Sequence, residues 1–280
     1  MTLKFTKMQG LGNDFMVVDA IHQSINFLPP LVQQWADRHF GIGFDQLLVV
    51  EEATQAGVDF CYRIFNADGS EVQQCGNGAR CFARFVVDKG LTDKTEIKVE
   101  TASGIIVLYM EQSGWVRVNM GAPNFSPNSL PFTPPQQQPN QAPYTLEVLG
   151  SSMTLGAVSM GNPHAVLVVE DIQTAQVDSL GAAIESHECF PERVNVGFAQ
   201  IIDRQHIALR VYERGAAETL ACGSGACAAM SVLRAWGLID ESVTVTLPGG
   251  DLLISWSGKV DDPVWMSGPA VTVFEGEISE

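Results

Sequence analysis

Two cysteines stand in similar glycine-rich turns, far apart along the chain. Cys75 opens the segment CGNGAR, and Cys222 opens the segment CGSGAC. An apolar pattern typical of a helix follows each turn. A cysteine directly before a helix lies near backbone N–H groups without intrahelical partners, and these donors favour the thiolate over the thiol. We therefore expect each turn to hold a reactive thiol at a small anion-binding site.

The spacing of polar residues indicates that the two turns belong to an internal repeat. Four landmarks recur in the same order in both halves of the chain: Asn13, Gln46, Asn66 and Cys75, then Asn162, Asn195, Glu213 and Cys222. The first and second landmarks are 33 residues apart in both halves, and the third and fourth are nine apart in both. The middle intervals, 20 and 18 residues, differ by only two. We interpret the chain as two homologous halves, each ending in a cysteine turn that opens a helix.

Two thiols on duplicated halves suit one kind of reaction, the inversion of a stereocentre next to a carboxylate. One thiolate removes the α-proton while the opposite thiol delivers a proton to the other face. Backbone N–H groups aimed at the carboxylate stabilise the carbanion that develops. This scheme requires neither a metal nor an organic cofactor, so we expect none.

Other uses of the cysteines fit the sequence less well. Cys81 follows Cys75 by six residues and Cys227 follows Cys222 by five, whereas common zinc knuckles use two to four. Cys81 and Cys227 fall in helix interiors, where a cysteine is usually a small buried hydrophobe. The segment GSGACA nominally matches a dinucleotide-binding loop, but no apolar strand precedes it. We leave Cys61 and Cys189 as structural residues.

The net charge indicates which partners are excluded, and the N-terminal segment indicates where the protein is located. Thirty-two acidic residues against 16 Lys and Arg give a net charge of −16, which would repel a phosphate backbone or an anionic membrane. We therefore expect neither nucleic acid nor membrane as a partner. The first residues lack the apolar run of a signal peptide. A reducing cytoplasmic location follows as an expectation, with free thiols.

Short β-branched segments alternate with a few helical patterns. The strands are expected at 14–21, 45–52, 59–67 and 95–111 in the first half, and at 164–170, 196–203, 206–214 and 243–247 in the second. Helices are expected at 29–40, 76–90 and 224–237. This mixture predicts an α+β protein.

A proline-rich stretch divides the halves. Residues 121–143 hold seven of the 14 prolines and cannot continue a sheet or a helix, so we expect a linker or long surface loop there. The predicted domains are residues 1–121 and 122–269. The C-terminal segment 270–280 is expected to pack back on the first domain.

Seven segments in order resemble one enzyme family. They are GLGNDF, RHFGIGFDQLLVV, FNADGSEVQQCGNGARC, GNPH, RVNVGF, YERGAAETLACGSGACA and GPAVTVFEGEI. Together they resemble diaminopimelate epimerases, from residue 8 to 276 except for the proline-rich stretch. The resemblance implies interconversion of LL- and meso-2,6-diaminopimelate without pyridoxal phosphate, on the route to lysine and peptidoglycan. It also implies two similar domains, each a mixed β-sheet wrapped round a central helix, with the site in the cleft and a homodimer as the assembly.

The resemblance also assigns roles to individual residues. It implies that Cys75 and Cys222 are the catalytic acid/base pair, and that His164 and Glu213 tune the thiols. The implied substrate-binding residues are Asn13, Gln46, Asn66, Gly76, Asn77, Asn162, Asn195, Glu213, Arg214, Gly223 and Ser224. Phe274 stands where some relatives carry a tyrosine that pairs subunits, so aromatic packing without the hydroxyl bond is expected there.

Four alternatives are compared with the epimerase interpretation. Proline or hydroxyproline racemases share the two-cysteine scheme, but their first turn reads Cys-Gly-His-Gly, whereas Asn77 stands here. Phenazine-type isomerases of the same fold lack the cysteine pair. A non-enzymatic amino-acid-binding protein would have two unreactive cysteines, and a thiol redox protein would carry a Cys-x-x-Cys motif, which is absent.

Overall fold

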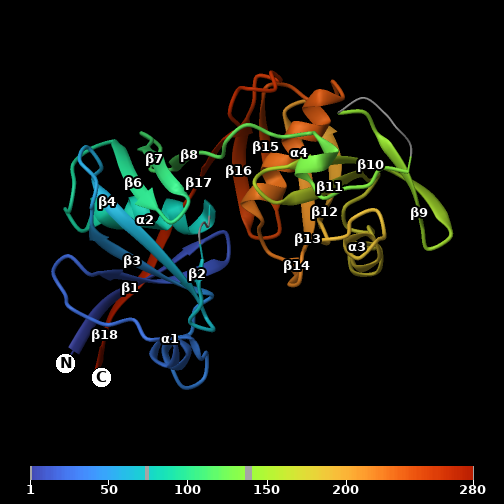
Figure 1. The fold of residues 1–280 in the computed structure, drawn as a ribbon. Helices are drawn as coiled ribbons and strands as arrows, with labels where there is room; N and C mark the ends of the chain where they lie inside the picture. Colours follow the sequence, from blue (N-terminus) through green and yellow to red (C-terminus); the bar gives the residue numbers. More distant parts are fainter. Residues whose placement is uncertain (1, 73–75, 136–140, 280) are drawn as a thin grey trace. The chain divides into compact units, whose positions relative to one another are not determined.

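The computed structural model describes residues 2–72, 76–135 and 141–279. The chain divides into two compact units (Figure 1). Unit 1 comprises Met1–Asn119 and Ser267–Glu280, and unit 2 comprises Met120–Met266. Strands predominate over helices in both, which confirms the α+β class. Within the described ranges, no helix is long and apolar enough to cross a membrane.

Unit 1 is a sheet whose strand order follows from its pairings. β18 pairs with β1, β1 with β2, β3 with β4, and β6 with both β7 and β4, while β8 lies beside β7. The β2–β3 and β4–β6 pairs are parallel, and the others are antiparallel. The elements are β1 (Thr2–Gly10), β2 (Asn13–Asp19), α1 (Pro29–Ala36), β3 (Gln46–Glu52), β4 (Phe60–Asn66), β5 (Glu71–Val72), α2 (Gly76–Asp88), β6 (Glu96–Thr101), β7 (Gly104–Met110), β8 (Val116–Asn119) and β18 (Val271–Ser279).

Helices cover both faces of this sheet. Met16 and Val18 of β2 pack with Val32 and Trp35 of α1 in one core cluster. Because side chains alternate along a strand, Phe15 and its alternate neighbours turn to the other face, where α2 contacts β1, β2 and β3. A strand covered on both faces must be apolar throughout, which explains the unbroken apolar runs in β2 and β3.

Unit 2 repeats this succession of pairings. β9 pairs with β10, β10 with β11, β12 with β13, and β15 with both β16 and β13. The β11–β12 and β13–β15 pairs are parallel, as are their counterparts in unit 1. The elements are η1 (Pro127–Ser129), β9 (Tyr144–Val148), β10 (Ser151–Ser159), β11 (Pro163–Val168), α3 (Val177–Glu185), β12 (Asn195–Asp203), β13 (His206–Glu213), β14 (Ala217–Thr219), α4 (Gly223–Ala235), β15 (Ser242–Leu247) and β16 (Gly250–Ser255). β17 (Trp265–Gly268) spans the unit boundary.

The registers of the two parallel pairs correspond as well. Phe15 lies opposite Gln46 in unit 1, and His164 lies opposite Asn195 in unit 2. α4 contacts β10, β11, β12 and β13, and its residues from 225 to 233 are buried. Each unit is therefore a mixed sheet with a largely buried central helix that begins just after a landmark cysteine.

Some expected elements differ in extent. The helix expected at 29–40 ends at Ala36, because the Asp37 carboxylate accepts hydrogen bonds from the backbone N–H groups of His39 and Phe40 and forms a turn. The strand segment expected at 95–111 forms two antiparallel strands, β6 and β7, joined as a hairpin. α3 was not predicted, since its short apolar stripe gives only a weak periodic signal.

The proline-rich stretch packs on unit 2 over its described part. Phe125, Leu130 and Phe132 are buried. The Phe132 ring stacks on Phe190 at a centroid distance of 4.7 Å and meets Tyr144 edge-on at 4.8 Å. Aromatic residues between the prolines anchor a segment that forms little regular structure.

Candidate active site

The unit 2 landmarks gather where strand ends meet the start of a helix. β11 and β12 are parallel and begin at this edge, while β13 runs antiparallel and ends there. α4 begins at the same edge. The residues brought together are Asn162, His164, Asn195, Glu213, Arg214, Cys222, Gly223 and Ser224.

Cys222 is the N-cap residue of α4, and its side chain is 4% exposed. Its carbonyl accepts the first helical hydrogen bond, from Ala226 N at 2.9 Å. A Cβ atom at Gly225 would lie 3.3 Å from the Cys222 Sγ and 3.0 Å from Val211. Gly225, which the sequence analysis did not single out, therefore makes room for the sulfur against the first helical turn.

The Cys222 thiol has an acceptor on one side and a donor on the other. The Glu213 carboxylate acts on this thiol mainly through its negative charge, and the Cys222 Sγ lies 3.5 Å from the Ser224 hydroxyl. Thr219 Oγ1 donates to Glu213 Oε1 at 2.5 Å and thereby fixes this carboxylate. Thr219 was missed in the sequence, although it lies within a segment that resembles the family.

Burial and charge oppose the expected thiolate at Cys222. Burial raises the pKa of the Cys222 thiol, and the negative charge of Glu213 raises it further. Hydrogen bonds from Ser224 and from the Gly225 backbone lower it, but the net direction is upward. At Cys222, desolvation therefore outweighs the effect of the helix start, which by itself would favour the thiolate.

His164 is connected to the Cys222 thiol through Asn162 and Ser224. The ring is 1% exposed, and burial together with the positive charge of Arg214 lowers the pKa of His164 to about 3, so the imidazole is neutral. His164 Nε2 donates to Asn162 Oδ1 at 3.0 Å, and Asn162 Nδ2 donates to Ser224 Oγ at 3.4 Å. The hydroxyl of Ser224 is left to donate to Cys222. Each hydrogen bond in this chain is therefore donated in the direction from His164 to the Cys222 sulfur.

Asn195, at the start of β12, and Arg214, just after the end of β13, are joined by a hydrogen bond. The Asn195 amide donates to the Pro163 carbonyl at 2.9 Å and accepts from the Arg214 backbone N–H at 3.0 Å. The Arg214 guanidinium donates to the Glu192 carbonyl at 3.1 Å and is exposed. Asn195 therefore fixes the backbone at Arg214 with its oxygen and is itself held by Pro163 through its nitrogen.

The unit 1 landmarks occupy the corresponding edge. Cys75 lies outside the described residues, whereas Gly76 and Asn77 form the first turn of α2. Gln46 Nε2 donates to Asn66 Oδ1 at 3.0 Å, and Asn77 Nδ2 lies 3.5 Å from Asn13 Oδ1. The predicted amides are therefore adjacent in pairs.

Gln46 also carries an open acceptor. Its Oε1 atom is buried and has no hydrogen-bond partner among the residues that the structure describes. A buried acceptor without a donor is costly, and such atoms in native proteins are usually explained by a ligand, a water or a strained site. Gln46 is thus suited to accept a hydrogen bond from a bound molecule.

Two further residues hold these amides and were missed in the sequence. Asn13 Nδ2 donates to Asp45 Oδ2 at 2.7 Å. Arg80, a fully buried residue of α2, donates to Asn77 Oδ1 at 3.0 Å and to the Pro269 carbonyl at 3.2 Å. Asp45 directly precedes Gln46 and Arg80 lies three residues after Asn77, but no sequence pattern shows which amides they contact.

The whole arrangement matches a known family. A family model described as diaminopimelate epimerase matches residues 5–126 and 156–273. A curated diaminopimelate epimerase from Nitrosomonas europaea is 60% identical over 278 residues, which cover 99% of each chain. The chain belongs to the diaminopimelate epimerase family. It is an isomerase, as the sequence resemblance predicted.

Solved structures show the breadth of the epimerase fold. A phenazine biosynthesis protein of the PhzF family from Bacillus anthracis superposes with a TM-score of 0.70 at 16% identity, covering all of both chains. A probable proline racemase from Agrobacterium radiobacter K84 gives 0.69 at 13% identity, covering 99% of this chain and 93% of that one. At such identities the likeness concerns the fold alone. The family model leaves 127–155 unmatched, which includes most of the proline-rich stretch.

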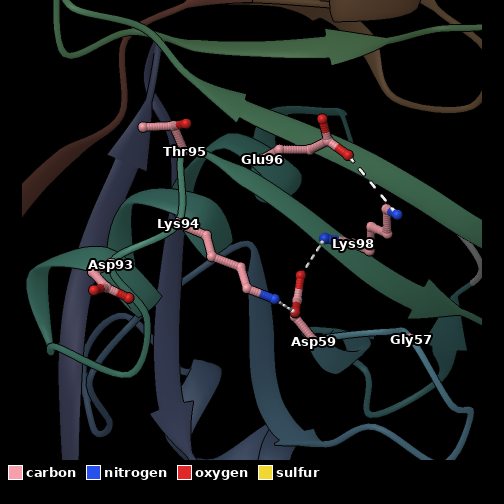
Figure 2. A pocket seen from close by; sticks show the side chains of 7 residues that line it. All are labelled: Gly57, Asp59, Asp93, Lys94, Thr95, Glu96 and Lys98. Atoms are coloured by element: carbon pink, nitrogen blue, oxygen red, sulfur yellow. Dashed lines mark hydrogen bonds and ion pairs between the residues drawn. The ribbon is translucent and has the colours of Figure 1, made fainter.

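Other features of this epimerase lie apart from the landmark residues. A surface pocket in unit 1 is lined by charged side chains, among them Asp59, Lys94, Glu96 and Lys98, and none of the landmarks lines it (Figure 2). Lys94 Nζ lies 2.5 Å from Asp59 Oδ1, so the charges largely satisfy one another. In the described parts of the chain, no group of three or more His, Cys, Asp or Glu residues is arranged to hold a metal ion.

The helix-interior cysteines, Cys81 and Cys227, and the C-terminal Phe274 lie in different surroundings. Cys81 and Cys227 are fully buried in α2 and α4, in agreement with their interpretation as small core residues. Phe274 lies on β18 and is 47% exposed, with its ring edge-on to Phe5 at 6.0 Å.

Proposed function

We propose that the chain interconverts LL- and meso-2,6-diaminopimelate by a two-base inversion in which Cys75 and Cys222 act on opposite faces of the α-carbon. The observation that carries the proposal is the Cys222 thiol, buried at the start of α4 between an acceptor, Glu213, and a donor, Ser224. Such a thiol can lose its proton to Glu213, and the Ser224 hydroxyl can then stabilise the thiolate by a hydrogen bond. The family relationship supplies the substrate.

In this scheme Glu213 and Ser224 control the protonation of Cys222. Glu213 takes the thiol proton when Cys222 acts as base, and the Ser224 hydroxyl then donates to the thiolate. The neutral His164 holds Asn162, which in turn leaves the Ser224 hydroxyl directed at the sulfur. When Cys222 acts as acid, its proton passes to the carbanion. The two-cysteine scheme uses no cofactor.

Two groups of atoms recognise the charged ends of the substrate. Backbone N–H groups of Gly223 and Ser224, and of Gly76 and Asn77, begin helices and are suited to hold the carboxylate next to the reacting carbon. The exposed guanidinium of Arg214 is suited to grip the distal carboxylate.

The ammonium groups need acceptors, and the side-chain amides provide them. The open Oε1 of Gln46 is one such acceptor. Asn13 Oδ1 and the second oxygen of Glu213 are further acceptors, while Asn66, Asn162 and Asn195 line the pocket with amide groups. A substrate with two ammonium and two carboxylate groups is thereby matched by both kinds of partner.

The test is proton NMR of LL-diaminopimelate in D2O with the reduced protein and no added cofactor. We expect loss of the α-proton signal and appearance of the meso isomer. Cys75→Ala and Cys222→Ala should each slow inversion by at least about 100-fold, since one of two acid/base groups is removed. Cys61→Ala removes a half-buried thiol outside the landmarks and is the matched control, expected to retain activity.

Two results would contradict the proposal in different ways. Inversion that survives in either of the two landmark cysteine variants would exclude the two-base scheme. No exchange by the reduced wild type would exclude the substrate, and proline and hydroxyproline would then be tested, because a probable proline racemase shares the fold. A homodimer and a cytoplasmic location, both implied by the family, complete the proposal.

A further inference from the structure

The duplicated halves hold their first asparagine in opposite orientations. In unit 1, Asn13 donates from Nδ2 to Asp45 and turns its Oδ1 toward Asn77, at 3.5 Å. In unit 2, Asn162 accepts at Oδ1 from His164 and turns its Nδ2 toward Ser224, at 3.4 Å. Asn77 and Ser224 both follow their landmark cysteine by two residues. One half thus presents an acceptor toward its cysteine turn, and the other presents a donor.

Residue types at equivalent positions explain the difference. Asp45 precedes Gln46, whereas the hydrophobic Val194 precedes Asn195. His164 follows Asn162 by two residues, whereas Phe15 follows Asn13. A carboxylate only accepts hydrogen bonds, so it selects the NH2 end of an asparagine, while the Nε2–H of a neutral imidazole selects the oxygen.

The carboxylate of Asp45 is itself held in place. Its Oδ1 accepts from Arg38 NH2 at 2.7 Å, and its Oδ2 also accepts from the Asp14 backbone N–H at 3.1 Å. Arg38 donates to both oxygens of Asp14 at 3.0 and 2.8 Å, and Lys7 Nζ reaches Asp14 at 2.5 Å. Burial would raise the pKa of Asp14, but the hydrogen bonds from Arg38 and Lys7 outweigh it and hold the value at about 2.

We propose that Asp45, fixed by Arg38, is a positioning residue that locks the Asn13 amide with its carbonyl oxygen toward the turn that opens α2. In this orientation the side of Asn13 that faces the turn is an oxygen, which accepts from Asn77 Nδ2, and an oxygen there suits a substrate ammonium group rather than a carboxylate. This inference rests on the proposed function, in which Asn13 binds the substrate. It assigns Asp45 an effect on binding without contact to the substrate.

The first measurement is the separate determination of KM and kcat for LL-diaminopimelate with Asp45→Asn. An asparagine at 45 is forced to direct a donor at either Arg38 or Asn13, so the Asn13 amide is no longer held in one orientation. We expect KM to rise about 10- to 100-fold with kcat within about twofold, because a misoriented binding amide weakens substrate and transition state alike. A purely structural defect would lower the active fraction, and hence the apparent kcat, without raising KM.

A double-mutant cycle with Asn13→Ala tests whether the effect passes through Asn13. Asp45→Asn should raise KM in the wild-type background and leave it within about twofold in the Asn13→Ala background. An equal rise in both backgrounds would overturn the proposal.

The matched control is Asp59→Asn. Asp59 also accepts from a cationic side chain, Lys94, and from a backbone N–H, that of Lys98 at 2.9 Å, but it lies in the charged pocket away from the landmarks (Figure 2). Its KM and kcat should stay at wild-type values. If Asp45→Asn does not fold, Arg38→Lys replaces it. Arg38 is half-exposed, and its guanidinium donates to both Asp14 and Asp45. A lysine cannot make both contacts in the same geometry, so KM should again rise, by about 3- to 10-fold. An unchanged KM in that variant would overturn the proposal.

A second readout does not depend on activity. The side-chain NH2 signal of Asn13 is assigned by its absence in Asn13→Ala, and its exchange with solvent is measured by 15N NMR. One of its protons should be protected in the wild type and in Asp59→Asn, and lose at least about 10-fold protection in Asp45→Asn. Unchanged protection would overturn the proposal, whereas an inactive wild type with this protection pattern would contradict only the proposed function.

Discussion

At the scale of single residues, the proposed chemistry of unit 2 depends on one sulfur, that of Cys222, close to the Glu213 carboxylate and the Ser224 hydroxyl. Cys222 is buried, and both burial and Glu213 raise its pKa, so the resting site holds a thiol. A catalytic base nevertheless needs the anion. The conflict is resolved if Glu213 accepts the proton only when the substrate is bound and its ammonium and carboxylate groups have changed the local field.

Glu213→Gln separates the electrostatic role of this carboxylate from its chemical role. Removing its negative charge should lower the pKa of Cys222, so the pH midpoint of Cys222 alkylation should fall by about 1 unit or more. Epimerisation should nevertheless slow by at least about 10-fold, because the proton acceptor is lost. Alkylation is followed by mass spectrometry of the Cys222 peptide in a Cys75→Ala background.

Glu218→Gln serves as the control for this pair of measurements. Glu218 lies on the same short strand as Thr219 and is paired with Arg210 at 2.6 Å, so its loss should leave the Cys222 midpoint unchanged. A midpoint that rises in Glu213→Gln would show that the carboxylate does not face the thiol.

At the scale of elements, unit 2 depends on how closely α4 packs against the sheet. β10 carries Gly156, where a Cβ atom would lie 2.4 Å from Val232 Cγ1 of α4 and 3.0 Å from the Trp236 ring. The absence of a side chain there lets α4 lie close to the sheet. This contact holds the C-terminal half of α4, the helix that Cys222 precedes, against the sheet.

Gly156→Ala should therefore destabilise the protein by about 1–3 kcal/mol, the usual range for overpacking a core. Urea unfolding monitored by circular dichroism measures the change in the free energy of unfolding. Gly197→Ala on β12 is the matched control, since its Cβ would meet Leu209 at an ordinary 3.5 Å, and its cost should be below about 1 kcal/mol. Equal costs for both variants would refute the close seating of α4.

At the scale of the whole molecule, duplication is the organising feature. Both units repeat one succession of strand pairings and carry one cysteine turn each, and the two-base scheme uses both turns. The chain also returns at its end to unit 1, where β18 pairs with β1 along most of its length. β18 exposes apolar side chains at Val271, Val273 and Phe274.

We expect the chain to sediment as a dimer, close to twice its mass of 30.3 kDa, with β18 in the interface. Phe274→Asp should shift the molecule to the monomer in sedimentation velocity experiments, because a charge in an apolar interface is left unpaired. Phe40→Asp changes another exposed aromatic of unit 1, 91% exposed, and should remain dimeric. A monomeric wild type, or a dimeric Phe274→Asp, would exclude this interface.

The sequence by itself determined the α+β class, the family and the duplicated landmarks. These depend on residue type and spacing, since a turn, a cysteine and a helix start are local features that a linear pattern records. It also indicated that Cys81 and Cys227 are core residues, because they fall within apolar helical patterns.

Only the tertiary structure decided how those landmarks are held and charged. The raised pKa of Cys222 depends on burial and on Glu213, and the orientation of Asn13 depends on Asp45, 32 residues away. The place of Gly225 beneath the sulfur likewise follows from the fit of Val211 against α4. Hydrogen-bond direction and desolvation arise from atoms brought together across strands, and no spacing along the chain specifies them.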